Sequence, residues 1–514
     1  MGALILSAAL PLAACSSGGG TAPTATPEGE IQEGGTAQIA AFGEFGGFDP
    51  VRLANVGSGV ERAANVLDTL LMRNETTDEV SPRLAKSMTS DDGITWVMEL
   101  REGVEFTDGT PVDAEAVIFN TQRHMAEDST STAKAMLSGI DKMEATGEYE
   151  VMFTLKEASG SFPLVFTASS PAGLIGSPAA LADPVAFNSQ PVGAGPFMLE
   201  EWVPDSTLTF VKNENYWEDG LPYLDKLEYT VMGDNQTRTD TLVSGGVDLA
   251  LINAAQWPQV SNAPGLSLYP SQIGGSAIVP NGAKAPTDDP RVREALLSAF
   301  DPQTTNNVLF GATDYLTVDN FTCTPFAPSS PACSKDAVYE YDPEKAKKLI
   351  ADYVKDGGDP TLEIVHFQSL VEQATYIQQQ FKAIGVTATL RSVDIAGLAE
   401  AQGTGDYGVF WGSTASSGFP TVWNRYYSGG TNWGMVTYPE LDEALLRARD
   451  DLKVEDRNSA WQDVADILHE NSVLQWITPY SAAMSKSDKL HLGLPDHPYE
   501  GSAMVYFSNA WLEQ

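Results

Sequence analysis

Residues 361–394 place the tightest limit on what this chain can fold into. TLEIVHF (361–367) and VTATLRSVD (386–394) are rich in β-branched residues and predict two strands. The stretch between them carries apolar residues at helical spacing, at Ala374, Ile377, Phe381 and Ile384. A strand, a helix and a second strand form a βαβ unit, which requires parallel strands. This part of the chain therefore predicts an α/β domain.

The flanking segments extend this pattern into two lobes. Asp289-Pro290 and Asp342-Pro343 each precede an amphipathic stretch and predict the first turn of a helix. The first half of the chain contains short alternating strands instead, at 94–100, 149–155 and 206–213. Alternation of this kind is typical of mixed or antiparallel sheet. With 514 residues, the chain is long enough for two to four globular units.

The charge is strongly acidic, with 69 Asp and Glu against 30 Lys and Arg and a net charge of −39. Such a field repels nucleic-acid phosphates and anionic lipid headgroups, so we expect no nucleic-acid partner. Solubility outside the cell explains the charge, and attraction of cationic solutes is the alternative.

The N-terminus has the features of an export signal. Residues 3–14 form a short apolar run that is too short to span a bilayer as a helix but suits a signal peptide, although no Lys or Arg precedes Arg52. The run ends in Leu-Ala-Ala-Cys, which resembles the bacterial lipobox. We therefore expect a signal peptide at 1–14, lipidation of Cys15, a flexible tether over 15–35 and membrane attachment through the lipid.

The two other cysteines, Cys323 and Cys333, flank a Pro- and Ser-rich loop. In an exported protein the compartment is oxidising, so the pair predicts a disulfide. Their spacing does not suit a metal site, and no His lies near them in the sequence.

Motifs for catalysis are absent from the sequence. It contains no G-x-S-x-G, H-E-x-x-H, C-x-x-C or Walker A pattern. Residues 403–408 match G-x-G-x-x-G, but a helical stretch precedes them and a strand follows, which is the reverse of a dinucleotide site. The five histidines are scattered. We therefore expect no enzymatic activity, no cofactor and no metal.

Aromatic residues concentrate in the turn-rich segment 410–434, together with Gly, Ser and one Arg. This mixture suits the wall of a ligand cleft, and a loop that packs its own aromatics is the alternative. The candidate ligand contacts are Trp411, Trp423 and Arg425 here, with Phe45 and Trp257 from the first half.

Four long segments resemble one protein family in the order of the chain. They are SPRLAKSMTSDDGITWVMELREGVEFTDGTPVDAEAVIFN (81–120), QPVGAGPFMLEEW (190–202), KNENYWEDGLPYLDKLEY (212–229) and NGAKAPTDDPRVREALLSAFD (281–301). These segments resemble the family 5 extracellular solute-binding proteins, the large peptide- and nickel-type receptors of ABC importers. In this family the glycines and the Trp and Tyr residues of such motifs are expected to pack the lobes rather than touch ligand.

The resemblance implies a type II periplasmic-binding-protein-like fold with three domains and two lobes that close on a hinge. Domain I would comprise 36–79, 190–280 and 488–514, domain II 80–189, and domain III 281–487. It implies a monomeric, extracytoplasmic lipoprotein that captures a small solute between domains I and III and delivers it to a membrane permease.

The segment that starts at Trp411 departs from the family pattern. Many peptide receptors resemble "GWxADYxDP" here and hold the peptide amine with an acid, whereas this chain reads WGSTASSGFP (411–420). Glu44, beside the first predicted strand, is a candidate substitute, and a solvated turn residue is the more common role at such a position. A peptide or peptide-like ligand is expected. An oligosaccharide, an opine-like compound or a metal chelate in the same fold is the alternative, and a secreted hydrolase or a non-transport sensor lipoprotein would be further from the family.

Overall fold

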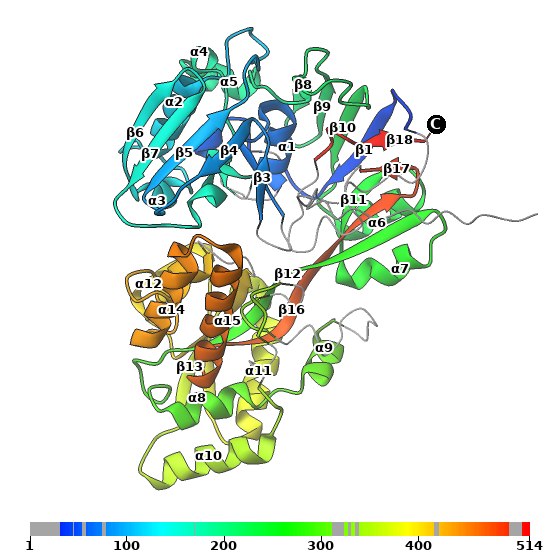
Figure 1. Cartoon of the computed structure of the whole chain (residues 1–514). Coiled ribbons are helices and arrows are strands. Elements are labelled where there is room, and N and C mark those ends of the chain that lie inside the picture. Colours follow the sequence, from blue (N-terminus) through cyan, green and yellow to red (C-terminus); the bar gives the residue numbers. More distant parts are fainter. Residues whose placement is uncertain are drawn as a thin grey trace, which may run out of the picture.

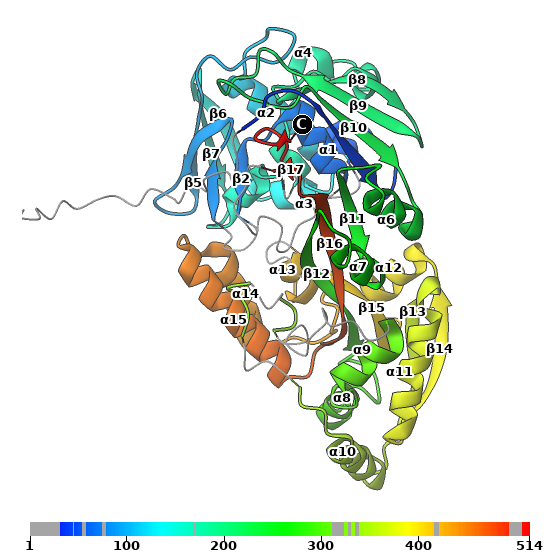
Figure 2. The ribbon, with the colours of Figure 1, turned by 90° about the vertical axis from the view of Figure 1, so that its right-hand side faces the viewer.

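The computed structural model describes residues 31–44, 46–53, 58–74, 79–168, 170–310, 323–326, 330–334, 339–415, 421–492 and 506–513. It has an upper and a lower lobe (Figure 1), and the division is equally clear from the side (Figure 2). Both lobes mix helices and strands, which confirms the predicted α/β class. The expected signal peptide and Cys15, with most of the tether, lie outside the described residues.

Two long strands join the lobes. β12 (Leu266–Pro280) and β16 (Gln475–Ser487) pair antiparallel and run from one lobe into the other (Figure 1). They lie in the middle of a ten-stranded sheet of order β14-β13-β15-β12-β16-β11-β1-β10-β9-β8. One sheet is therefore shared by both lobes, and its two central strands are the covalent connection between them.

Five strands at one end of this sheet, β11, β1, β10, β9 and β8, belong to the upper lobe. β1 (Thr36–Ala41) runs parallel to β10 (Lys226–Val231) and to β11 (Leu249–Asn253). β9 (Thr207–Lys212) and β8 (Phe197–Val203) complete the edge as antiparallel strands. α1 (Ser58–Leu67) packs on β8, and its apolar residues join the core of the lobe.

A second sheet of the upper lobe is antiparallel, as the alternating segments predict. Its order is β4 (Ala85–Thr89), β5 (Thr95–Leu100), β7 (Glu150–Leu155), β6 (Ile140–Gly147), and α2 (Ala114–Met125) packs on it. The smaller elements of this lobe are β2 (Leu71–Arg73), β3 (Val80–Pro82), α3 (Lys134–Leu137), α4 (Pro178–Leu181), α5 (Pro184–Ser189), α6 (Asn235–Val243), α7 (Trp257–Ser261), β17 (Leu490–His491) and β18 (Trp511–Leu512).

The lower lobe contains the predicted βαβ unit. β13 (Thr361–Phe367) pairs parallel with β14 (Thr387–Val393) and with β15 (Val409–Ala415), and α11 (Val371–Ala383) connects the first two. The apolar face of α11 is buried, as its spacing predicts. The other helices are α8 (Pro290–Leu297), α9 (Pro302–Phe310), α10 (Pro343–Lys355), α12 (Ile395–Thr404), α13 (Thr421–Tyr426), α14 (Pro439–Asp450) and α15 (Val454–Glu470).

Local signals fix several helix ends. The Asp289 carboxylate accepts from Arg291 N at 2.9 Å, and that of Asp342 accepts from Lys345 N at 2.8 Å, so both predicted caps form. Gly405, with φ +72°, ends α12 in the left-handed conformation. The G-x-G-x-x-G match thus closes a helix ahead of β15, which is incompatible with the strand-to-helix turn of a dinucleotide site.

A buried polar network binds the family-like Tyr-Trp motif to the upper lobe. Arg83 Nε donates to Asp68 Oδ1 at 2.8 Å, and Tyr216 Oη and Trp217 Nε1 donate to Asp68 Oδ2 at 3.0 and 2.9 Å. Arg83 also donates to the Tyr216 hydroxyl and pairs with Glu218 at 3.3 Å. Tyr216 and Trp217 therefore pack the scaffold, as the resemblance implies.

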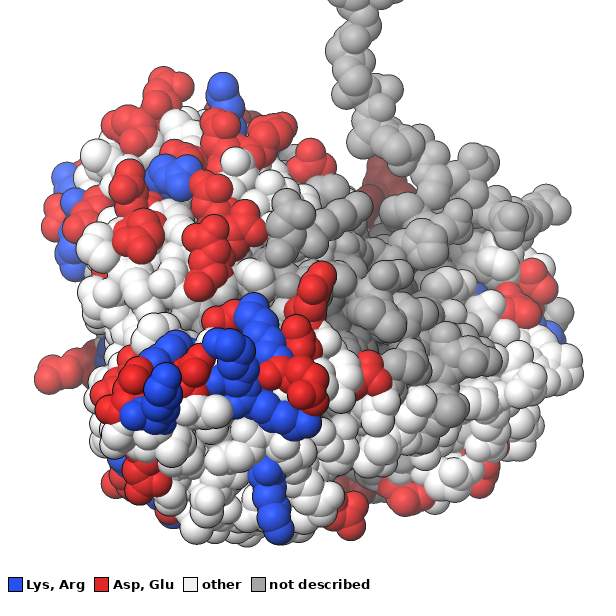
Figure 3. All heavy atoms as spheres, turned by 90° about the horizontal axis from the view of Figure 1, so that it is seen from below, with Lys and Arg blue, Asp and Glu red and all other residues white. Residues whose placement is uncertain are grey.

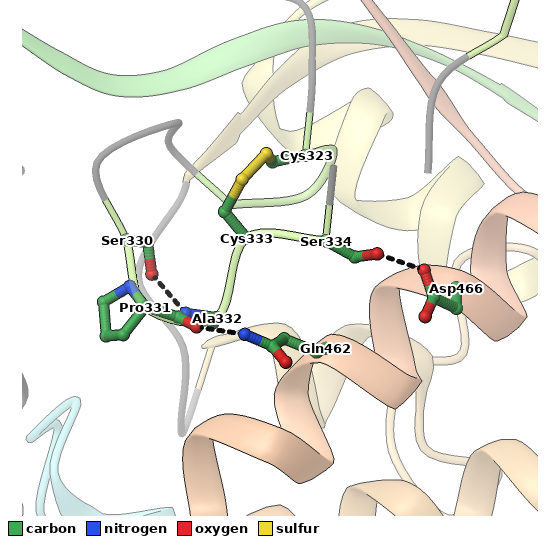
Figure 4. Close-up of a disulfide and its surroundings, with 8 residues drawn as sticks. All are labelled: Cys323, Ser330, Pro331, Ala332, Cys333, Ser334, Gln462 and Asp466. Atoms are coloured by element: carbon green, nitrogen blue, oxygen red, sulfur yellow. Dashed lines mark hydrogen bonds between the residues drawn. A yellow bond between two sulfur atoms is a disulfide. The ribbon is translucent and has the colours of Figure 1, made fainter. Parts of the chain in front are cut away.

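The Cys323–Cys333 loop is fastened to a helix of the lower lobe. The two residues form a disulfide with Cα atoms 4.7 Å apart (Figure 4). Next to it, Ser334 Oγ donates to Asp466, and Gln462 Nε2 donates to the Pro331 carbonyl at 2.8 Å, both on α15. The described residues beside the disulfide, 330–334, are thus docked on α15.

Charged side chains on the lower lobe are mixed in sign. Seen from below, Lys and Arg gather among Asp and Glu (Figure 3). Lys345 Nζ lies 2.6 Å from Glu294 and Arg291 lies 2.7 Å from Asp356, and each pair joins an exposed side chain to a partly exposed one. Such pairs contribute little stability individually. Among the helices that the structure describes, none is long and apolar enough to cross a membrane.

Candidate functional site

The parallel strands of both lobes end at the interface between them. In the upper lobe, β11 ends at Asn253, which pairs with Ala482 near the middle of β16. In the lower lobe, β15 ends at Ala415, which pairs with Gly274 near the middle of β12. Ligands of open α/β sheets bind at the carboxyl ends of the strands. The topology therefore directs the binding edges of the two lobes toward each other.

A pocket of about 470 Å³ lies between the lobes. Its upper wall comes from the region of α3, β7 and the 3-10 turn after it, and includes Met136, Leu155, Phe162 and Val165. These residues belong to segment 80–189, expected as domain II, and not to the segments expected as domain I. Its lower wall comes from α13 and α14 and includes Trp423, Asn424 and Arg449. The volume falls within the range of small-molecule sites, which are mostly apolar with a few polar groups.

A clasp of hydrogen bonds lies beside this pocket. Gly160 N donates to the Asp450 carbonyl and Ser161 N to the Arg449 carbonyl, both at 3.0 Å. Arg449 also pairs with Glu157 at 3.2 Å. A Cβ at Gly160 would overlap the carbonyl oxygen of Asp451, so the close approach of the two backbones requires glycine here. The lobes thus touch through backbone groups at this edge.

Trp423 presents an aromatic surface in the pocket wall. Its ring stacks on Tyr427 with centroids 4.5 Å apart and planes 22° apart, and the Arg449 guanidinium lies 5.8 Å from its centre. The two rings are four residues apart, so they occupy one face of the chain at α13. Trp423 is half-buried, which leaves part of the indole for a solute.

Arg425 is a half-buried cation on the same helix. Its guanidinium carbon lies 4.1 Å from the centre of the Trp433 ring. Burial lowers the pKa of this guanidinium, because water is withdrawn from the charged form. Among the described residues, no carboxylate lies within 4.0 Å of it and no acceptor bonds its N–H groups. A desolvated guanidinium in this state favours an anionic ligand.

Of the predicted contacts only Trp423 lines the pocket; Arg425 lies on the same helix but is not one of the lining residues, and the others lie elsewhere. Trp411 is fully buried in the core of the lower lobe, and Trp257 in a core of the upper lobe with its Nε1 bonded to the Ile252 carbonyl at 3.0 Å. We therefore assign both tryptophans to the core, since β-strand and helix packing leave no surface for a solute. Phe45 lies outside the described residues.

Glu44 is also accounted for by scaffold contacts. Its carboxylate accepts from Trp202 Nε1 at 3.1 Å and from the backbone of Asp205. These partners belong to the outer edge of the upper-lobe sheet, so Glu44 is not assigned to the ligand amine.

The sequence did not single out the pocket wall from the upper lobe. In the sequence, Met136, Phe162 and Val165 have the pattern of ordinary core residues. Arg449 looks like a basic residue that ends a helix. Only the docking of one lobe on the other makes them a wall. Within the described ranges, no group of three His, Cys, Asp or Glu residues could hold a metal ion.

Comparison with known proteins agrees with this architecture. The family model described as "Bacterial extracellular solute-binding proteins, family 5 Middle" matches residues 79–435. The glutathione-binding protein GsiB of Salmonella paratyphi A is 30% identical over 416 residues, covering 77% of this chain and 79% of the relative.

Solved structures show the same fold. The ABC transporter substrate-binding protein CtaP of Listeria monocytogenes superposes with a TM-score of 0.77 at 20% identity, covering 94% of this chain and 100% of its own. The oligopeptide-binding protein AppA of Bacillus subtilis, in complex with a nonapeptide, gives 0.72 at 21% identity with coverages of 94% and 100%. The predicted type II binding-protein fold is thereby confirmed. The chain belongs to the family 5 bacterial extracellular solute-binding proteins, and is an extracytoplasmic solute receptor for ABC import rather than an enzyme.

Proposed function

We propose that this receptor captures a short peptide or peptide-like solute that bears a carboxylate, and delivers it to the permease of its importer. The observation that carries the proposal is Arg425, a desolvated guanidinium with no carboxylate partner among the described side chains. A ligand carboxylate would supply the missing acceptors in a charge-assisted hydrogen bond. Trp423 would cover the apolar part of the same ligand.

Relatives narrow the ligand class. GsiB is described as a glutathione-binding protein, and AppA is seen with a peptide. Glutathione is a small peptide with two carboxylates and one ammonium group, so it combines the anion that Arg425 favours with peptide character. We therefore place short anionic peptides, with glutathione as the first member to test, ahead of long neutral ones.

An oligosaccharide is the second candidate. The stacked Trp423 and Tyr427 rings offer the kind of flat aromatic surface on which a sugar face packs. Arg425 argues against it, because a neutral sugar would leave the buried guanidinium without a counter-charge.

The same proposal includes the membrane anchor and the domain plan. Lipidation of Cys15 after removal of 1–14 would tether the receptor, as a monomer, to the outer face of the cytoplasmic membrane. The domain limits remain those expected from the sequence, and β12 and β16 serve as the hinge. Their pairing along the whole length supports this role, because both lobes share the two strands.

Isothermal titration calorimetry with glutathione, its diester, trialanine and maltotriose tests the proposal. We expect glutathione and trialanine to bind, the diester to bind at least tenfold more weakly, and mass spectrometry to recover the solutes unchanged. Equal affinity for glutathione and its diester would refute the role of Arg425 as a carboxylate site. Binding of maltotriose alone would establish an oligosaccharide as the ligand.

A further inference from the structure

A small second pocket lies in the upper lobe, apart from the one between the lobes. It measures about 30 Å³ and lies at the carboxyl end of β1, where Phe42, Glu61, Arg62, Tyr229, Leu251 and Met484 line it. A space of this size holds one or two groups as large as water. β1 and β11 direct their carboxyl ends toward the lower lobe, so the pocket lies on the ligand-binding edge of this sheet.

Glu61 is the acid of this pocket. Tyr229 Oη donates to Glu61 Oε1 at 3.3 Å, and Asn65 Nδ2 donates to the same hydroxyl at 3.3 Å, so the carboxylate is held from one side. Among the described contacts, no Lys, Arg or His nitrogen comes within 4.0 Å of the Glu61 oxygens. A carboxylate in an apolar wall without a cation is costly unless a ligand supplies one.

The cation nearest to Glu61 in the sequence, Arg62, is engaged elsewhere, so the cation for Glu61 would come from a ligand. Arg62, the neighbouring cation, donates to the Gly43 carbonyl at 3.1 Å and lies over the Tyr229 ring at 5.7 Å. Glu61 keeps some exposed surface as a residue although its carboxyl group is desolvated, and Phe42 on the rim is 43% exposed. Because Glu61 lines the pocket, a small cationic group that enters it would meet the carboxylate.

We propose that the Glu61 pocket receives the ammonium group of the transported ligand. The inference rests on the proposed function and deepens it: Arg425 takes a carboxylate in the lower lobe, and Glu61 takes the amine in the upper lobe. It also accounts for the absence of acids in 411–420, the segment that would otherwise hold the amine. Glu44, the substitute expected from the sequence, is already bonded to Trp202 and Asp205.

The protonation of Glu61 agrees with this assignment. Burial raises the pKa of the Glu61 carboxyl to about 7, and the charge of Arg62 and the bond from Tyr229 oppose the rise only in part. An ammonium bound beside it favours the ionised form. Binding of an amine at pH 7 should therefore release protons to the buffer.

The direct test uses small amines on the full chain without any peptide. Methylammonium chloride fits the pocket and tetramethylammonium chloride does not, so at pH 8 and equal concentration only the first should raise the melting temperature. Glu61→Gln should abolish the difference. Glu115→Gln, in the first turn of α2 and exposed, should retain it. An equal response of wild type and Glu61→Gln would overturn the proposal, whether or not peptides bind.

Peptides provide the second arm. N-acetylation of trialanine should weaken binding to wild type at least tenfold and leave binding to Glu61→Gln unchanged. If acetylated and free trialanine bind wild type equally, Glu61 is not the amine site, although the receptor function stands. If Glu61→Gln fails to fold, proton release by wild type, measured calorimetrically in two buffers of different ionisation enthalpy, decides instead. Its absence would refute the assignment.

Discussion

Arg425 lies with its guanidinium carbon 4.1 Å from the centre of the Trp433 ring, so a cation–π contact holds its charge against the lower lobe. A cation–π contact compensates for lost water only in part. The guanidinium is therefore oriented and desolvated before the ligand arrives, which reduces the ordering cost of binding.

Replacing Arg425 by Met should remove the anion site. Loss of a charge-assisted hydrogen bond should weaken glutathione binding about 10- to 100-fold. The melting temperature should change by no more than about 2 °C, because the cation has no protein carboxylate to lose. Calorimetric titration measures the first effect and scanning calorimetry the second.

Arg447→Met is the matched control, since Arg447 is an exposed Arg of α14 that pairs with Asp463 at 2.7 Å. It should bind as wild type does. A large fall in melting temperature without loss of affinity in Arg425→Met would show that Arg425 serves the fold.

Gly160→Ala should open the clasp between the lobes. The added methyl group would meet the carbonyl oxygen of Asp451, so the 157–161 segment must withdraw from the end of α14. If closure of the lobes contributes to binding, affinity should fall about tenfold, which corresponds to roughly 1.4 kcal/mol. Small-angle scattering of the ligand-saturated variant should give a larger radius of gyration.

Gly403→Ala serves as its control, because a methyl group there meets nothing within 4 Å. This change lies inside α12 and should stabilise the helix slightly, by about 0.5 to 1 kcal/mol, with no effect on scattering. Unchanged affinity and radius in Gly160→Ala would mean that the clasp is incidental to closure.

Arg83→Met should destabilise the upper lobe. The variant would leave the buried Asp68 carboxylate without a cation, because Tyr216 and Trp217 only donate hydrogen bonds to it. Breaking a buried pair in this way costs about 3 to 5 kcal/mol. A fall of several degrees in the melting temperature is expected by scanning calorimetry.

Lys86→Met tests the same chemistry at the surface. Lys86 and Glu102 are 3.5 Å apart and exposed, so this pair should contribute less than about 1 kcal/mol. Equal effects of Arg83→Met and Lys86→Met would contradict the role given to burial.

Glu61 should make stability depend on pH between about 4.5 and 7. Its pKa in the folded protein is about 7, above the ordinary value of 4.5, so the folded state binds more protons in this window. Stability then falls as pH rises through it, by at most about 3 kcal/mol for the single group. Glu61→Gln stays neutral and escapes this loss.

The melting temperature of Glu61→Gln minus that of wild type should therefore be near zero at pH 4.5 and positive at pH 8. Comparison of the two proteins removes the other carboxylates from the result. A difference that is constant with pH would show that Glu61 does not titrate in this range.

Local patterns in the sequence determined the elements of this protein. The βαβ unit of 361–394, the caps at Asp289 and Asp342 and the alternating strands of the first half depend on neighbours two to four positions apart, and each forms as expected. Long collinear motifs also identified the family, because they encode scaffold contacts such as Arg83 with Tyr216.

Tertiary structure alone decided which of these residues can meet a ligand. Trp411 and Trp423 look alike in an aromatic-rich segment, yet strand β15 buries the first in the core while α13 leaves the second in a pocket wall. Glu61 and Glu44 are the same residue type in the sequence, but only packing shows that Trp202 bonds Glu44 whereas no cation pairs with Glu61 among the described contacts. Burial and pairing depend on contacts between residues far apart in the chain, and no local pattern records those contacts.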